Sequence, residues 1–415
     1  NFGFSCFSYT PFEGTCDHNQ AHSDQHAATI ANGKLYIGND GGVYARSLTD
    51  HAQGDWADLN QHLDMLQYYG ASGSADGVIY GGLQDNGSNK VFTTPTSVLD
   101  DNSKSINVSS VQVFGGDGGY TLVDPTNSNN VMTEYVLLAI SKSTDGGANW
   151  HHIKPPDPDP RFISPLIMDR TNPSHLVAGG AIVWNSEAGI AGTTTGTGTS
   201  TDWQPIFDVR TALGGNVASE VTALDAVTIG GTQYVAAAWC GPCNASFSTG
   251  TGFHAGIVML SNSGGSWHAT SQACTGTSTA CSASGLPNRY ISGVKIDTSN
   301  PGHAYLTLSG YSRKWMIGPD DPGVGHVFET SNGGTSWADV SGNLPDGPMD
   351  DAVFENGKLI VGSDFGVFIS TDDGTTWSRL GTNLPDVVIG QLTIDPNGTL
   401  IAATHGRGIW TMKAP

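Results

Sequence analysis

The sequence predicts an all-β chain built from repeated four-stranded antiparallel sheets. The main observation is a recurring turn, Ser/Thr-x-Asp/Asn-x-Gly-x-x-Trp, which ends at Trp150, Trp337 and Trp377, with a copy one residue short ending at Trp267. Short segments of alternating apolar and polar residues separate these turns, and Gly accounts for 56 of the 415 residues. In such a turn the Asp or Asn side chain bonds the backbone ahead of it, Gly takes a positive φ, and Trp packs between neighbouring sheets.

These turns resemble the Asp-box, or BNR, repeat of sialidase-like β-propellers. The resemblance implies a single β-propeller of four-stranded blades, in which each motif is the turn between the third and fourth strands of a blade. Because the motif is a structural turn, the resemblance concerns the scaffold rather than a reaction.

The alternating segments can be assigned to eight successive blades. The first has strands at 26–31, 34–38 and 43–47 and a short strand at Trp56. Later blades begin near Gln67, Tyr120, Pro165, Glu220, Tyr290, Met349 and Val388. The last unit, 388–412, has three strands, and we expect the apolar N-terminal segment 2–9 to close it, which makes residues 1–415 one domain. Seven blades is the alternative, if residues 67–92 and 111–114 are divided differently.

Charge and composition limit the partners. The chain has 38 acidic and 17 basic residues and a formal net charge of -21. Such a surface repels phosphate backbones and anionic lipid, so nucleic acid and membrane surfaces are poor partners. No apolar run approaches a membrane span. Cations and neutral ligands, including glycans, and proteins remain as partners.

The six cysteines form three close pairs in the sequence. Their even number and local spacing predict disulfides in an exported protein, from which a signal peptide has been removed, and the pairs are Cys6 with Cys16, Cys240 with Cys243, and Cys274 with Cys281. The segment Trp239-Cys240-Gly241-Pro242-Cys243 matches the thioredoxin active site, where it opens a helix. Here residues 233–238 read as a strand and no helical pattern follows, so we interpret the pair as a disulfide at the base of a long loop.

The repeat register assigns the remaining loops to one face. Because strand direction alternates within a blade, the turns after each second strand share a face with the connections between blades. In sialidase-like families this face carries the site. Here it collects His22, Asp24, His26, Asp40, Gln84, Asp85, Asp117, Asp364, His405 and Arg407. Asp-Gly is also a common hairpin signal, so any one aspartate has a turn role as its alternative, whereas imidazole and guanidinium serve no turn geometry.

Two further interpretations concern ligands. The long loop 311–323 brings Tyr311, Arg313 and Trp315 to the same face, as an aromatic ledge on which sugar rings could stack, unless the loop buries its own aromatic residues. The gathered aspartates favour a structural Ca²⁺ site, held by some of Asp24, Asp40, Asp85 and Asp117, because a divalent cation offsets their mutual repulsion. The alternative metal is Zn²⁺ or a similar ion, to which His22 and His26 could offer nitrogen, and no cofactor is required.

The segments around the candidate face look like secreted bacterial BNR-repeat proteins commonly labelled glycosyl-hydrolase-like. Asn39-Asp40-Gly41-Gly42-Val43-Tyr44 is similar to the catalytic turn of glycoside hydrolase family seventy-four xyloglucanases, and Ser363-Asp364-Phe365-Gly366-Val367-Phe368 is a looser match. That resemblance implies a glycoside hydrolase with Asp40 and Asp364 as its carboxylate pair and a neutral polysaccharide as substrate. Those enzymes place the two aspartates on two facing propellers, whereas this chain holds one propeller. The alternative is a non-catalytic propeller that binds glycan or protein.

The sequence argues against a sialidase. Sialidase chemistry needs three arginines that clamp a carboxylate, with an Arg-Ile-Pro segment near the start of the chain. This chain has few arginines, no such segment, and an acidic face that would repel sialic acid.

Overall fold

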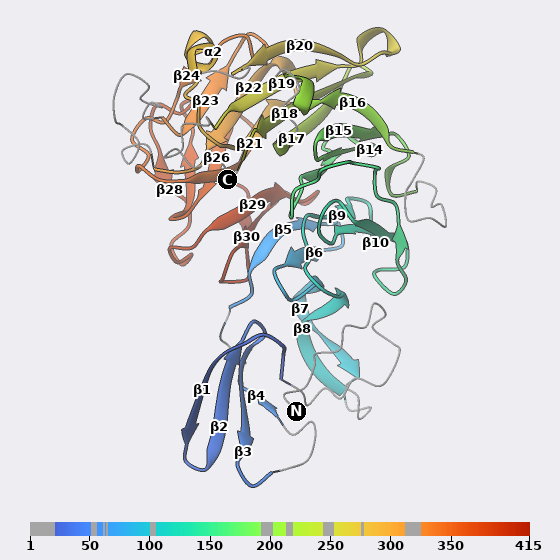
Figure 1. Cartoon of the computed structure of the whole chain (residues 1–415), viewed down its shortest axis with the longest axis vertical. Helices are drawn as coiled ribbons and strands as arrows, with labels where there is room; N and C mark the ends of the chain where they lie inside the picture. Colours follow the sequence, from blue (N-terminus) through green and yellow to red (C-terminus); the bar gives the residue numbers. More distant parts are fainter. Residues whose placement is uncertain are drawn as a thin grey trace.

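The computed structural model describes residues 21–50, 56–60, 63, 65–99, 105–191, 202–212, 219–243, 253–274, 278–311 and 325–415. Within these ranges the chain forms eight antiparallel sheets, seven with four strands and one with three, and in each sheet every strand pairs with the next one in sequence (Figure 1). The predicted β-propeller architecture, with eight repeated sheets, is confirmed.

The first four sheets are built from the following strands: β1 (Gln25–Ala31), β2 (Lys34–Asn39), β3 (Gly42–Ser47) and β4 (Ala57–Asp58); β5 (Tyr68–Gly73), β6 (Val78–Leu83), β7 (Ser88–Leu99) and β8 (Ser105–Phe114); β9 (Thr121–Asp124), β10 (Asn127–Glu134), β11 (Ile140–Ser143) and β12 (His151–His152); β13 (Leu166–Asp169), β14 (Asn172–Gly179), β15 (Ile182–Ser186) and β16 (Gln204–Asp208).

The last four sheets continue the pattern: β17 (Glu220–Ile229), β18 (Thr232–Cys240), β19 (Ala255–Ser261) and β20 (His268–Ala273); β21 (Ile291–Asp297), β22 (Asn300–Leu308), β23 (Val327–Thr330) and β24 (Ala338–Asp339); β25 (Met349–Glu355), β26 (Lys358–Ser363), β27 (Gly366–Ser370) and β28 (Ser378–Arg379); β29 (Ile389–Ile394), β30 (Thr399–Thr404) and β31 (Ile409–Lys413). Short helices lie in the connections: η1 (Gly189–Ala191), α1 (Val209–Ala212), η3 (Ser263–Gly265) and α2 (Ser278–Ala283).

The sheets pack through their first strands. From β5 onward, each first strand contacts the first strand of the next sheet, through β9, β13, β17, β21, β25 and β29, and β29 packs back against β5. The sheet β1–β4 lies beside these seven (Figure 1). Its first strand is exposed along its whole length, whereas the corresponding strands β17 and β21 are largely buried. The predicted closing strand, 2–9, falls outside the described residues.

Side chains link the innermost strands, because adjacent sheets share no backbone ladder. The Thr222 hydroxyl donates to the Ile291 carbonyl over 2.7 Å, and the Ile296 amide donates to Asp225 Oδ2 over 2.8 Å. Farther round, the Leu392 amide donates to Asp351 Oδ2 over 2.9 Å. Each of these hydrogen bonds is buried and satisfies a backbone group of an innermost strand.

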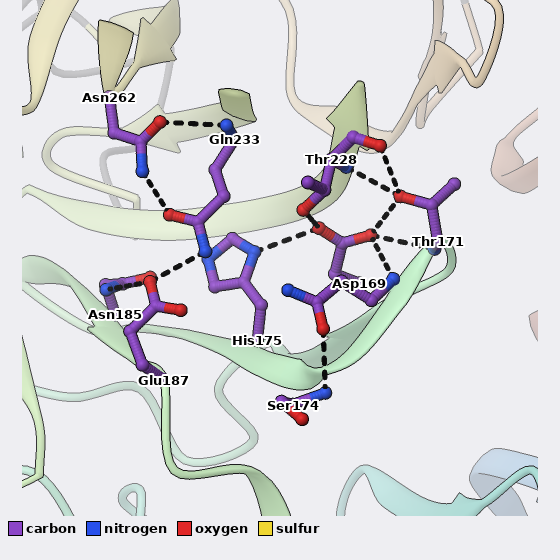
Figure 2. Close-up of polar contacts among 10 residues, drawn as sticks. Asp169, Thr171, Ser174, His175, Asn185, Glu187, Thr228, Gln233 and Asn262 are labelled. Atoms are coloured by element: carbon purple, nitrogen blue, oxygen red, sulfur yellow. Dashed lines mark hydrogen bonds and ion pairs between the residues drawn. The ribbon is translucent and has the colours of Figure 1, made fainter. Parts of the chain in front are cut away.

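A second such link joins β13 to β17 on the face opposite the candidate site (Figure 2). Asp169 accepts hydrogen bonds from Thr171, from the Thr228 hydroxyl at 2.6 Å and from His175 Nδ1 at 3.0 Å. Burial alone would raise the pKa of Asp169, but these donors outweigh it and lower the pKa. Asp169 therefore acts as a structural tie between two sheets.

The repeated turn has the geometry that its residues predict. Ser143 Oγ accepts from the Gly147 amide at 2.9 Å, Asp145 Oδ1 accepts from the Asn149 amide at 2.9 Å, and Gly147 has a φ of 94°. Trp150 Nε1 donates to the Val113 carbonyl of the preceding sheet at 2.8 Å. The shorter copy forms η3 instead, and its Trp267 is partly buried against the core between sheets.

We predict that Ser143→Ala destabilises the fold by about 1–3 kcal/mol, because the buried Gly147 amide loses its acceptor. The measurement is urea unfolding. Thr144→Ala, at the exposed neighbouring position, is the control and should unfold like the wild type. Equal midpoints for Ser143→Ala and the control would show that the turn does not need this hydroxyl.

Candidate functional site

The structure places the predicted residues at one end of the sheets. Asp85 lies in the β6–β7 turn, Asp117 in the β8–β9 connection, Asp364 in the β26–β27 turn and His405 between β30 and β31. The Trp-terminated turns lie at the other end, after β11, β23 and β27. We call the first end the mouth face. The loops that the sequence register assigned to one face therefore lie at the same end of their sheets.

Four predicted aspartates gather where the first sheet meets β6 and β7. Partial burial raises the pKa of Asp85. The nearby negative charges of Asp117, Asp40 and Asp24 raise it further, and His22 lowers it. The Asp85 amide donates to Asp117 Oδ1 at 3.0 Å, and His22 Nε2 lies 3.1 Å from the Asp85 carbonyl oxygen.

Turn roles account for part of this cluster. Asp24 and Asp85 adopt φ values of 59° and 58°, a conformation that Asp tolerates better than most residues. Asp40 Oδ1 is hydrogen-bonded by His26 Nε2, and the Asn86 side chain donates to the Asp40 carbonyl at 3.0 Å. The cluster is thus held by hydrogen bonds between the first sheet and the β6–β7 turn.

The remaining predicted binding residues lie around this cluster. The His405 ring is 5.3 Å from that of Tyr69, and burial lowers the pKa of His405. Burial, followed by the charges of Asp117 and Asp85, raises the pKa of Tyr69 to about 12. The Gln84 backbone amide donates to the Gln67 carbonyl. Arg407 is exposed and donates to the carbonyl of its neighbour Gly406.

The structure gives Asp364 a carboxyl neighbour other than Asp40. Asp40 belongs to the first sheet, which lies well apart from β26 in Figure 1. Asp364 instead faces Asp350, the second residue of β25. Burial, then the charge of Asp364, raises the pKa of Asp350 to about 8. Burial also raises the pKa of Asp364, and its hydrogen bond with Asp350 acts in the opposite direction. Two such carboxyls hold one proton between them near neutral pH.

Further polar residues of the mouth face were missed by sequence reasoning. The Arg161 guanidinium lies 5.5 Å from the centre of the Tyr290 ring, and Arg161 Nε is 3.7 Å from Glu220 Oε2. Burial raises the pKa of Tyr290, Arg161 opposes the shift, and the charges of Glu220 and Asp350 add to it. Tyr290 thus lies within electrostatic reach of Asp350, and Arg161 contacts both Tyr290 and Glu220.

A signal for these residues was present in the sequence. Tyr120, Glu220 and Tyr290 lie at or just before the start of the first strand of a sheet. The sequence analysis assigns them only as the beginnings of blades. In an innermost strand, buried on both faces, a polar residue at the start is unusual and points to the axis. Asp350 and Arg161 carried no such signal, because neither belongs to a recognisable motif.

Glu134, the last residue of β10, is fully buried near this group. Its Oε1 accepts from the Leu138 amide at 3.1 Å and the Ser164 amide at 2.9 Å, and Oε2 has no hydrogen-bond partner among the described residues. Burial raises its pKa to about 8, although these amides and Arg161 oppose the shift.

The two disulfides that fall within the described residues are confirmed. Cys240 bonds Cys243 and Cys274 bonds Cys281, while the predicted pair of Cys6 with Cys16 lies outside the described ranges. Cys240 is the last residue of β18, so the thioredoxin-like segment ends a strand, as the disulfide interpretation requires.

Only the base of the predicted aromatic ledge can be described. Tyr311 is 43% exposed, whereas Arg313 and Trp315 lie outside the described residues. The buried Arg289 donates to the carbonyls of Ser309 and Gly310 at 3.0 Å and of Gly325 at 2.6 Å. Both ends of the long loop therefore meet at one guanidinium.

The comparisons with known proteins bear on the fold. A xyloglucanase of glycoside hydrolase family 74 from Xanthomonas campestris aligns with a TM-score of 0.50 and 15% identity over 93% of this chain and 49% of the enzyme, so this chain spans about half its length. YCF48 from Cyanidioschyzon merolae aligns with a TM-score of 0.50 and 12% identity over 85% of this chain and 96% of that protein. At these identities the likeness shows a shared β-propeller fold.

The comparisons by sequence give no match. No protein family model and no curated protein sequence matches the chain. None of the helices in the described ranges is long and apolar enough to cross a membrane.

We predict that Glu134 makes the fold lose stability as pH rises. A carboxyl whose pKa is higher in the folded than in the unfolded protein favours folding most below its unfolded pKa of 4.5, and this contribution declines up to about pH 8. Glu134→Gln should therefore gain stability relative to the wild type across this window, by several kcal/mol in order of magnitude. Urea unfolding at a series of pH values measures it, with the exposed Glu355→Gln as control. A constant difference between wild type and Glu134→Gln would contradict the assignment.

Calcium binding stays a prediction. Across the described part of the chain, no three His, Cys, Asp or Glu side chains are placed to hold one metal ion. The expected result for a calcium site among Asp24, Asp40, Asp85 and Asp117 is a higher melting midpoint in Ca²⁺ than in EDTA, since a ligand of the folded state stabilises it. Equal midpoints, with no metal by elemental analysis, would show that hydrogen bonds alone hold these aspartates.

Proposed function

We propose that this protein is a secreted propeller that binds a neutral polysaccharide across its mouth face and hydrolyses glycosidic bonds there. The observation that carries the proposal is the Asp350–Asp364 pair, which lies within electrostatic reach of Tyr290. Arg161 joins the Tyr290 ring to Glu220. The disulfides support secretion, since such bonds persist outside the cytosol. The net charge of -21 favours a neutral over an anionic glycan.

The proposed chemistry needs one protonated and one ionised carboxyl. The Asp350–Asp364 pair retains a proton near neutral pH, and Asp364, which is less deeply buried, delivers it to the glycosidic oxygen as the C–O bond breaks. Glu220 is the candidate for the second carboxylate, which takes a proton from the water that adds to the anomeric carbon. Asp40, which sequence similarity suggested as the partner of Asp364, is assigned instead to ligand binding at the first sheet.

The non-catalytic alternative has its own support. The pair suggested by sequence similarity, Asp40 and Asp364, is divided between two separate parts of the mouth face, and Asp40 is engaged by His26. A propeller that only binds glycan needs no carboxylate pair. Binding without turnover would favour this alternative.

We predict that the wild-type protein releases reducing ends from at least one of xyloglucan, mixed-linkage β-glucan, xylan and mannan. Asp364→Asn should lower this rate by about 100-fold or more while leaving binding within a few fold, because only proton transfer is lost. Activity should fall as pH rises through about 8, where the pair loses its proton.

The matched control is Asp373→Asn, an exposed aspartate on the opposite face with a φ of 53°, which Asn also adopts. It should hydrolyse and bind like the wild type. No reducing ends from any polysaccharide, or an Asp364→Asn rate equal to that of the control, would refute the hydrolytic mechanism.

A further inference from the structure

The turn between β10 and β11 has a strained backbone. Leu137 and Leu138 are consecutive and have φ values of 57° and 53°. L-amino acids other than Gly, Asn and Asp rarely adopt this left-handed conformation, which costs roughly 1–2 kcal/mol per residue. Leu138 is buried, so its side chain packs in the core, but Leu137 is 51% exposed. Burial therefore explains the conformation of Leu138 and leaves that of Leu137 unexplained.

Hydrogen bonds tie this turn to a distant segment between β12 and β13. The Leu137 amide donates to the Phe162 carbonyl at 2.9 Å. Glu134 Oε1 accepts from one amide of each segment, Leu138 and Ser164. A fully buried carboxyl with an unpartnered oxygen is itself costly. The contact between the two segments therefore carries two unfavourable features, the left-handed backbone of the turn and the buried Glu134 carboxyl.

The result is a pair of exposed apolar side chains from two segments. Phe162 is 54% exposed and Leu137 is 51% exposed. Burying an apolar side chain away from water stabilises a fold. The strained turn leaves two apolar side chains at the surface, so burial of these side chains does not offset the strain. Strain of this kind is concentrated at binding sites.

The position of this pair connects it to the mouth. Phe162 follows Arg161, whose guanidinium covers the Tyr290 ring and whose Nε faces Glu220. An aromatic face with an adjacent cation and carboxylate matches a pyranose ring, which has an apolar face of C–H groups and a rim of hydroxyls. A charged ligand would gain nothing from the apolar pair.

We propose that Leu137 and Phe162 form a subsite that stacks one pyranose ring of the polysaccharide beside the Asp350–Asp364 pair. The identity of the ligand rests on the proposed function, whereas the subsite itself rests on the geometry of the two segments. The Arg161 guanidinium donates hydrogen bonds to the hydroxyls of the same ring, whereas Glu220 keeps the proton-accepting role proposed above. Glu134 acts as a positioning residue that fixes the two segments.

The test is isothermal titration of wild type, Phe162→Ala and Phe162→Tyr with xyloglucan, mixed-linkage β-glucan, xylan and mannan. Phe162→Ala should bind its polysaccharide roughly tenfold more weakly, and Phe162→Tyr should retain affinity because the aromatic face remains. Leu48→Ala, which removes another exposed apolar side chain, 44% exposed and beside β3, is the control and should bind like the wild type. Phe162 is exposed, so melting midpoints of all variants should agree.

The outcomes separate this inference from the proposed hydrolysis. Binding by Phe162→Ala within twofold of the wild type would overturn the subsite while leaving the catalytic pair intact. Weaker binding by Phe162→Ala, with Asp364→Asn as active as the wild type, would support the subsite and refute the pair. A wild type that binds none of the four polysaccharides would overturn both proposals. Equal losses of affinity for Phe162→Ala and Leu48→Ala would overturn the subsite alone.

Discussion

The bonds between the innermost strands of neighbouring sheets are the constraint on which the rest of this propeller depends. Each sheet satisfies its own backbone through antiparallel ladders, but no ladder crosses from one sheet to the next. Short polar side chains replace it: the Thr393 hydroxyl donates to the Ala71 carbonyl at 2.9 Å, and Ser72 Oγ accepts from the Val123 amide at 2.8 Å. These bonds set the spacing and register of the strands around the axis. They therefore also decide which strand starts meet at the mouth.

The two faces divide structure from chemistry, and the aspartates show the division most clearly. Asp145, in a Trp-terminated turn, has its pKa lowered to about 2, because hydrogen bonds from Asn149 and Ser143 outweigh its slight burial. Asp350, on the mouth face, is partly buried beside another carboxyl, and its pKa rises to about 8. The same side chain thus caps a turn at one end of the sheets and retains a proton at the other.

The mouth face also concentrates features that oppose folding. The fully buried Glu134 and the partly buried Asp350 each have a buried oxygen without a hydrogen-bond partner among the described residues, and two leucines of the same face adopt left-handed backbone conformations. On the opposite face, in contrast, Asp169 accepts hydrogen bonds from three different side chains. Natural sequences accept such conflicts where function requires them. The seven packed sheets supply the stability that tolerates them.

Local chemistry was enough to establish the repeated turns, the sheets, two disulfides and the face on which the loops gather. Each of these depends on residues within a few positions of one another: Gly147 allows the turn, Trp150 follows it, and Cys240 lies three residues from Cys243. Tertiary contacts between distant segments decided three other features. These are the carboxyl partner of Asp364, the burial of Glu134 and the position of the first sheet. Asp350 belongs to β25 and Arg161 to the β12–β13 connection, and neither has a motif. Only the packing of the sheets brings both within electrostatic reach of Tyr290. Side-chain charge state follows burial and neighbours, and both are set by tertiary contacts rather than by local sequence.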